Sequence, residues 1–113
     1  MFDIVCLGEA LGEFNATHGE AGMFRFGHGG DTSNCAIAAA RQSAKVAYVS
    51  ALGDDEPGRS FRTLWQAEGV DDSHVATQKD AATGLYFVSH GPAGHAFSYL
   101  RAGSAASRYT PGD

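Results

Sequence analysis

The residues best suited to bind a ligand are a pair of glycines just before a predicted helix, in the run His28-Gly29-Gly30-Asp31-Thr32-Ser33-Asn34. Glycine lets a ligand approach the backbone, and the first turn of a helix offers unpaired N–H groups with partial positive charge. The side chain of Asn34, which can donate and accept, is spaced to reach the same ligand. The run therefore predicts a site for an oxygen-rich ligand, although glycine followed by an aspartate N-cap is also ordinary helix punctuation.

A second group of polar and aromatic side chains lies on a predicted hairpin over residues 84 to 101, with its loop at residues 91 to 94. With that loop, the period of two along a strand pairs Tyr86 with Tyr99 and puts both on one face with Arg101. Two phenol hydroxyls beside a guanidinium suit a polyhydroxy acid, because arginine binds a carboxylate through two parallel hydrogen bonds. A cross-strand aromatic pair that only stabilises an exposed sheet, with Arg101 solvated, fits the pattern equally well.

The elements that must position these residues alternate along the chain: a strand at residues 2–8, a helix at 31–43, a strand at 45–52, and a helix that begins at Asp54 or Asp55 and ends before Gly69. This order predicts an α/β fold with a parallel sheet and right-handed crossovers. The segments at residues 12–28 and 84–101 do not fit a plain strand–helix–strand repeat. We expect them to form a small β lid over a pocket.

Composition excludes several classes of protein. The 113 residues are 43% hydrophobic and 19% charged, which is typical of a single globular domain. A formal charge of −5 without a basic run argues against nucleic acid as a partner. No apolar stretch is long enough to span a membrane, and the first residues do not resemble a signal peptide. The chain contains neither GxxxxGK[ST] nor a complete GxGxxG, so no nucleotide-phosphate loop is predicted.

The cysteines and histidines complete this picture. Cys6 falls in a predicted strand and Cys35 in a predicted helix, and we expect both to be buried free thiols, which favours the cytoplasm. None of the five histidines has the spacing of a zinc ligand, so we expect no metal site built from protein ligands.

The glycine-pair run, with Ser43 and Gly53 downstream, resembles the first signature of the PfkB (ribokinase-like) carbohydrate kinases. Thr32 stands where most of that family has Gly, Ala or Pro, and the form Gly-Gly-Asp-Thr-x-Asn is similar to 2-keto-3-deoxygluconate kinases. Further runs resemble the family's Gly-x-Asp-x-x-Gly turn and the lid strands of the same subgroup: Gly53-Asp54-Asp55-Glu56-Pro57-Gly58, Thr83-Gly84-Leu85-Tyr86 and Ser98-Tyr99-Leu100-Arg101-Ala102-Gly103-Ser104-Ala105.

The resemblance implies that the following residues line a sugar-acid site: Gly30, Asn34, Tyr86, Tyr99 and Arg101. Glu13, five residues past Gly8, occupies the place where ribokinases hold a sugar-binding aspartate. That position varies in the keto-acid subgroup, so Glu13 is an additional candidate.

The resemblance also implies a fold and an activity. The fold is a ribokinase-like, three-layer, doubly wound parallel sheet with a β lid, and residues 1–113 would be its N-terminal, sugar-binding portion. The activity is transfer of the γ-phosphoryl group of ATP, with Mg²⁺, to the terminal hydroxyl of 2-keto-3-deoxygluconate. In the family, the aspartate base and the ATP pocket lie in a second half, whose Gly-Ala-Gly-Asp element does not occur in residues 1–113. No catalytic residue is therefore assigned in this chain, and we expect it to be inactive alone.

Two other functions stay open at this point. Another PfkB sugar kinase, ribokinase-like or fructokinase-like, would leave Arg101 without a carboxylate partner. The chain could also be a non-catalytic sugar-binding or dimerisation module. Whichever function holds, we expect a homodimer formed through the lid, because several apolar lid residues would otherwise leave a sheet face or edge exposed, namely Phe24, Phe26, Val88 and Phe97.

Overall fold

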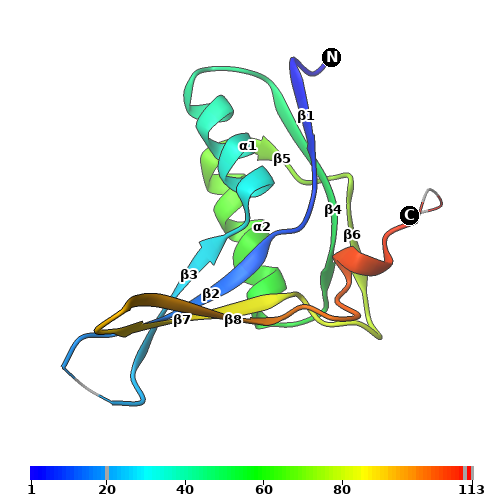
Figure 1. Ribbon diagram of the computed structural model, residues 1–113. Coiled ribbons are helices and arrows are strands. Elements are labelled where there is room, and N and C mark those ends of the chain that lie inside the picture. Colours follow the sequence, from blue (N-terminus) through cyan, green and yellow to red (C-terminus); the bar gives the residue numbers. More distant parts are fainter. Residues whose placement is uncertain (20, 111, 113) are drawn as a thin grey trace.

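The computed structural model describes residues 1–19, 21–110 and 112, which form two sheets and two α-helices (Figure 1). The elements follow one another as β1 (Ile4–Leu7), β2 (Leu11–Ala16), β3 (Phe24–Gly29), α1 (Asp31–Arg41), β4 (Val46–Gly53), α2 (Glu56–Glu68), β5 (Val70–Asp71), β6 (Val75–Gln78), β7 (Leu85–Gly91), β8 (Gly94–Leu100) and the short 3₁₀ helix η1 (Ala106–Arg108).

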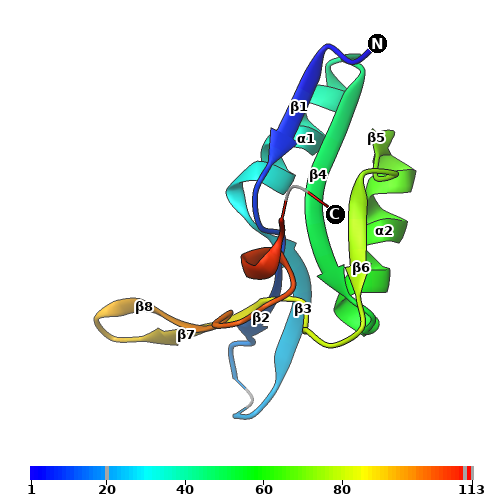
Figure 2. The ribbon, with the colours of Figure 1, turned by 90° about the vertical axis from the view of Figure 1, so that its right-hand side faces the viewer.

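The main sheet is parallel and is built around β4. β1 pairs with one edge of β4, while β5 and β6 pair with β4 near its two ends. Both α1 and α2 cover the same face of this sheet, and η1 lies against the opposite face (Figures 1 and 2). The predicted α/β class with a parallel sheet is confirmed.

The two helices begin differently. α2 has Asp55 as its N-cap, one of the two residues predicted, and its carboxylate accepts a hydrogen bond from the Gly58 N–H at 2.9 Å. α1 has Gly30 as its N-cap, with a φ of +99° and no side-chain cap. The start of α1 is therefore not an aspartate cap, because Asp31 already lies inside the helix.

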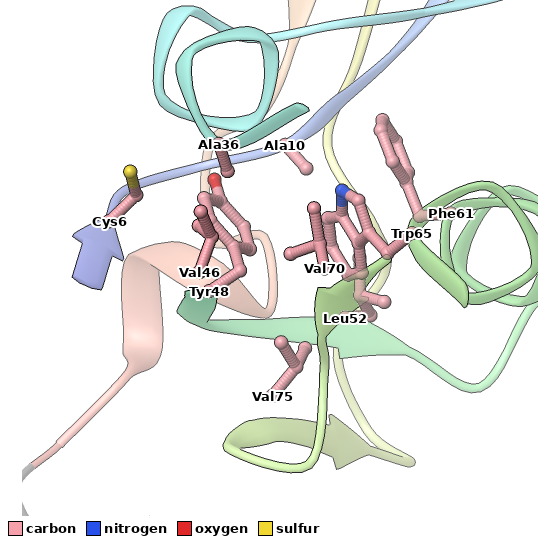
Figure 3. Packing of buried hydrophobic residues seen from close by; sticks show 10 residues of the cluster. All are labelled: Cys6, Ala10, Ala36, Val46, Tyr48, Leu52, Phe61, Trp65, Val70 and Val75. Atoms are coloured by element: carbon pink, nitrogen blue, oxygen red, sulfur yellow. The ribbon is translucent and has the colours of Figure 1, made fainter. Parts of the chain in front are cut away.

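The core between the helices and the main sheet contains the aromatic side chains of Tyr48, Phe61 and Trp65 among smaller apolar ones (Figure 3). Trp65 of α2 is fully buried, and its indole N–H donates to the Ser33 hydroxyl at 2.9 Å. The hydroxyls of Tyr48, from β4, and Thr32 lie 2.7 Å apart. Two consecutive residues of α1 are thus hydrogen-bonded to core aromatics, which satisfies polar groups that would be costly to bury alone.

One cysteine prediction is wrong. Cys6 is buried as expected, but Cys35 is exposed, and both are free. Ser33 and Ala36 are the residues that α1 buries completely, and at 100° per residue Cys35 falls on a different side of the helix. A run of small apolar residues did not reveal which of its sides would face the sheet.

The lid is a second sheet with the strand order β3-β2-β7-β8, which extends away from the foot of the main sheet (Figure 1). Its β7–β8 register is the predicted one, with Tyr86 opposite Tyr99 and His90 opposite His95. The turn is tighter than predicted, because Gly91 also pairs with Gly94 and leaves only residues 92–93 between the strands.

Candidate functional site

A hollow of about 400 Å³ lies where the N-terminus of α1 meets the lid. Its walls come from the segment after β1, the start of α1, and the strands β7 and β8 with the residue that follows them: Glu9, Leu11, Gly30, Asp31, Thr32, Tyr86, Phe97, Tyr99 and Arg101. The structure thus brings Gly30, Tyr86, Tyr99 and Arg101 together around one hollow. It lies near the carboxyl end of β1, where open parallel sheets commonly bind ligands.

Each of the two positions before α1 requires glycine for a different geometric reason. Gly30 needs its positive φ, and a Cβ there would lie 2.5 Å from the carbonyl oxygen of Glu9. A Cβ on Gly29 would lie 2.4 Å from the hydroxyl oxygen of Tyr86. Gly29 therefore leaves room for the Tyr86 ring, and Gly30 lets the chain turn into the helix against the segment that follows β1.

Tyr86, Tyr99 and Arg101 form one wall of the hollow. The two tyrosine rings are 5.8 Å apart between centroids, and the Arg101 guanidinium carbon lies 5.9 Å from the Tyr99 centroid. The cross-strand pairing of β7 with β8 sets this arrangement, and a cation over an aromatic face is itself favourable. The wall combines aromatic surface, hydroxyl groups and a positive charge, which suits a polyhydroxy acid.

Glu9 is a residue of the hollow that the sequence did not single out. Its Oε1 lies 3.0 Å from Nε of Arg101, and its Oε2 accepts a short hydrogen bond from the Ser104 hydroxyl. Glu9 is only 13% exposed, whereas Arg101 is 51% exposed. The signal that could have found it is its place just after the first strand of the predicted parallel sheet, beside Gly8. Arg101 thus has a carboxylate partner within the chain.

Glu13 does not line the hollow but lies behind it. The hydroxyl of Tyr86 donates to Glu13 Oε2 at 2.9 Å. Burial, and then the hydrogen bond and negative charge of Glu13, raise the pKa of Tyr86 to about 12. Glu13 therefore contacts a residue of the wall and stands one layer back from any ligand there.

Asn34 lies apart from the other predicted site residues. Its backbone N–H closes the first helical bond to the Gly30 carbonyl at 3.0 Å, but its side chain is exposed and borders a different hollow with His28, Arg41 and Leu64. The helical rotation between residues 30 and 34 sends the two toward different openings. A role for Asn34 in binding stays a prediction.

The start of β7 is tied to the N-terminus of α2 through Asp55. Its Oδ2 accepts the Thr83 N–H at 2.9 Å, and its Oδ1 accepts the Thr83 hydroxyl at 2.7 Å and the Gly58 N–H. Burial alone would raise the pKa of Asp55, but the hydrogen bonds from Thr83 and Gly58 outweigh it and the pKa lies below its ordinary value. This anchor stands three residues before Tyr86 and so fixes where the wall begins.

Within residues 1–19, 21–110 and 112, no group of three or more His, Cys, Asp or Glu side chains is arranged to hold a metal ion. Over the same residues, no helix is long and apolar enough to cross a membrane.

Comparison with known proteins places this geometry in context. Residues 1–111 match the family described as pfkB family carbohydrate kinase. A 2-dehydro-3-deoxygluconokinase of Thermoproteus tenax is 38% identical over 120 aligned positions, which cover all of this chain but only 37% of the relative. The chain therefore spans little more than a third of that protein's length.

Solved structures give the same result for the fold. A PfkB protein of Polaromonas sp. JS666 superposes with a TM-score of 0.88 at 34% identity, over 96% of this chain and 38% of the other. A fructokinase of Xylella fastidiosa with bound ATP superposes with a TM-score of 0.86 at 30% identity, over 94% of this chain and 35% of the other. These likenesses confirm the predicted ribokinase-like fold.

Proposed function

The chain belongs to the pfkB family of carbohydrate kinases, and from that premise we propose that it forms the sugar-binding part of a kinase that phosphorylates 2-keto-3-deoxygluconate on its terminal hydroxyl. The observation that carries the proposal is the hollow at the N-terminus of α1, where Arg101 and two tyrosines form one wall. The similarity to the Thermoproteus tenax 2-dehydro-3-deoxygluconokinase, named for the same keto acid, supports this choice.

Two parts of the hollow have a role in the proposed binding mode, namely the Arg101 end of the wall and the N-terminus of α1. Arg101 would hold the carboxylate, with the aromatic face of Tyr99 beside it. The backbone at Gly30 and the first turn of α1 would hold ligand oxygens, since helix N-termini favour negative charge. Asn34 borders another hollow, so its predicted contact with the ligand stays a prediction and is not used in this binding mode.

One observation favours a second candidate, a kinase of neutral sugars. Arg101 is already paired with Glu9 at 3.0 Å, so a neutral sugar would not leave the guanidinium without a partner. The fructokinase neighbour shows that this fold also serves a neutral sugar. For a keto acid to bind as proposed, its carboxylate must share Arg101 with Glu9 or displace it.

The chemistry of phosphoryl transfer lies outside this arrangement. Such enzymes work mainly by positioning the reactants and stabilising charge, and the described residues would supply the positioning. No step through Mg²⁺ or ATP is assigned to the described residues. We place ATP, Mg²⁺ and the aspartate base in the portion of the kinase that this chain does not span, and this chain alone would transfer no phosphate.

Under this proposal, the 113 residues by themselves would act as a sugar-binding module without catalytic activity. The cytoplasm stays the predicted location on the strength of the two free cysteines.

Calorimetry on the 113-residue protein tests the substrate class. The protein should bind 2-keto-3-deoxygluconate more tightly than fructose. Arg101→Ala should weaken keto-acid binding about tenfold or more, as expected for a hydrogen bond to a charged group, and change fructose binding by less than about twofold. Arg59→Ala, on the exposed side of α2, is the matched control and should change neither. Equal losses for both ligands would remove the carboxylate role, and binding of neither would remove the proposed function.

A further inference from the structure

The hydroxyl group of Tyr86 has its only proton committed within the protein. It donates to Oε2 of Glu13 at 2.9 Å, and a glutamate carboxylate has acceptors only. A phenol oxygen whose proton is used in this way can still accept hydrogen bonds through its lone pairs. Because Tyr86 lines the hollow and Glu13 does not, these lone pairs are what the phenol has left for a ligand.

The carboxylate of Glu13 is held on its other side as well. Asn15 donates its side-chain N–H to Glu13 Oε1 at 3.0 Å. The Asn15 amide oxygen lies 2.7 Å from Nε2 of His90, which must be the donor in this pair because the amide oxygen can only accept. A hydrogen-bonded series therefore links His90, Asn15, Glu13 and Tyr86, and its donors converge on the Glu13 carboxylate: His90 donates to Asn15, Asn15 donates to Glu13 from one side, and Tyr86 donates to Glu13 from the other.

The sheet keeps this series in register. Strands β2 and β7 are parallel neighbours, with Glu13 opposite Tyr86 and Asn15 opposite Val88. The Tyr86 ring fits over Gly29, which has no side chain to displace it, and faces Tyr99 at 5.8 Å. Glu13, Asn15, Tyr86 and His90 are all half-buried, so the phenol is held where it is rather than turning freely in water.

We propose that Glu13 is a positioning residue that fixes Tyr86 as a hydrogen-bond acceptor toward the ligand, so that the hollow takes a ligand hydroxyl at Tyr86 and rejects a carboxylate or keto oxygen there. The inference rests on the proposed function and adds an orientation to it. The hydroxyl-bearing part of the sugar lies at Tyr86, and the carboxylate lies toward Arg101. Glu13 occupies the place where ribokinases hold a sugar-binding aspartate, but in this proposal its carboxyl group acts on the ligand only through Tyr86.

Glu13→Gln is the decisive variant, because it reverses the direction of the hydrogen bond between residue 13 and Tyr86. His90 still holds the Asn15 oxygen, so Asn15 still donates and takes the single acceptor of the new amide. The amide N–H₂ then donates to the Tyr86 oxygen, and the phenol proton turns toward the hollow. The ligand position that favoured a hydroxyl proton would now favour an acceptor.

The probes are 2-keto-3-deoxygluconate and its analogues with one hydroxyl at a time replaced by fluorine, which removes the proton and keeps a similar size. Affinities are measured by calorimetry on the 113-residue protein. In the wild type, we expect one analogue to bind about tenfold more weakly than the parent keto acid. In Glu13→Gln and in Tyr86→Phe that difference should fall below about twofold. Glu56→Gln, an exposed glutamate paired with Arg59 on α2, is the control for loss of charge and should keep the wild-type difference.

A second readout follows Tyr86 without any ligand. In ¹³C NMR of labelled tyrosine, Glu13→Gln should lower the pKa of Tyr86 from about 12, since the hydrogen bond and charge of Glu13 help to raise it. Should Glu13→Gln fail to fold, Glu13→Asp keeps the charge, withdraws the carboxylate from the phenol, and should reduce the fluorine penalty in part.

The outcomes separate this inference from the proposed function. An unchanged fluorine penalty in Glu13→Gln overturns the role of Glu13, whatever the substrate. Tighter binding of fructose than of the keto acid overturns the substrate class, and the fluorinated fructoses then test Tyr86 in the same way. Failure of the wild type to bind any of these sugars overturns both.

Discussion

Asp55 and Thr83 are joined by two hydrogen bonds across 28 residues of chain, one from the Thr83 backbone N–H at 2.9 Å and one from its hydroxyl at 2.7 Å. Asp55 is at the same time the N-cap of α2. One carboxylate therefore fixes the start of a core helix and the residue from which the chain enters β7. Asp55 therefore links the stability of the main sheet and its helices to the position of the wall formed by Tyr86, Tyr99 and Arg101.

Replacing Asp55 with alanine should destabilise the protein. The change removes a helix cap, worth about 1 kcal/mol, and the carboxylate's hydrogen bonds to Thr83, and we expect a total loss of about 2–3 kcal/mol in the free energy of unfolding. Urea denaturation followed by circular dichroism measures it. Thr83→Ser keeps both hydrogen bonds to Asp55 and the one from the Gly53 N–H, and should cost clearly less. Equal losses would contradict the contribution of the Asp55 carboxylate.

The contribution of Asp55 should also depend on pH. Its pKa is lower in the folded protein than the ordinary value, so its stabilisation is complete above the unfolded pKa of about 4 and is lost as the pH falls through the folded pKa. The stability difference between wild type and Asp55→Asn should therefore be constant at neutral pH and shrink on acidification. Urea midpoints of both proteins between about pH 7 and pH 2.5 test this, and a difference that grows on acidification would contradict it.

Gly29→Ala should impair both binding and folding. An added Cβ would lie 2.4 Å from the Tyr86 hydroxyl oxygen and only 2.6 Å from a ring carbon, so the ring must move out of its place in the wall. We expect keto-acid affinity to fall about tenfold or more, with a loss of stability of about 1–3 kcal/mol. Calorimetry and urea denaturation give the two values. Gly91→Ala, at the far end of the hairpin where a Cβ meets only an atom 4.0 Å away, is the matched control.

Glu9→Gln should raise the affinity for the keto acid. Glu9 is paired with Nε of Arg101. Removing its charge leaves the guanidinium free to pair with a ligand carboxylate. The new amide can still accept a hydrogen bond from the Ser104 hydroxyl. We expect an increase of about threefold to tenfold for 2-keto-3-deoxygluconate and little change for fructose. A loss of affinity for the keto acid would show that Glu9 itself binds the ligand.

The lid should form a homodimer. Several large apolar or aromatic lid residues are more than a third exposed: Phe24, Phe26, Phe97, Tyr99 and Leu100. Val88, predicted to share this exposed surface, is buried instead. Phe97→Glu should shift the protein toward monomer in sedimentation, whereas Ser89→Glu, also exposed, should not. A wild type that stays monomeric at about 50 µM, where a lid dimer of micromolar affinity would be mostly associated, would contradict the prediction.

Much of the local structure could be predicted from the sequence. Apolar runs identify β1, β4 and both helices, because periodicity and capping residues act over a few positions. The hairpin register followed from the turn residues, since a period of two pairs Tyr86 with Tyr99 once the turn is placed. The turn itself is two residues shorter at its centre than the four predicted, without any change of register.

The tertiary structure decided which residues meet. Glu9 reaches Arg101, and Glu13 reaches Tyr86, only because sheet order brings segments near the two ends of the chain together. The side of α1 that faces the core likewise determined that Cys35 is exposed and that Asn34 borders a different hollow from Gly30. Local sequence fixes the direction of a side chain relative to its own helix or strand. Its neighbours depend on how those elements pair and pack, and these non-local contacts turn a glycine pair and a tyrosine hairpin into one site.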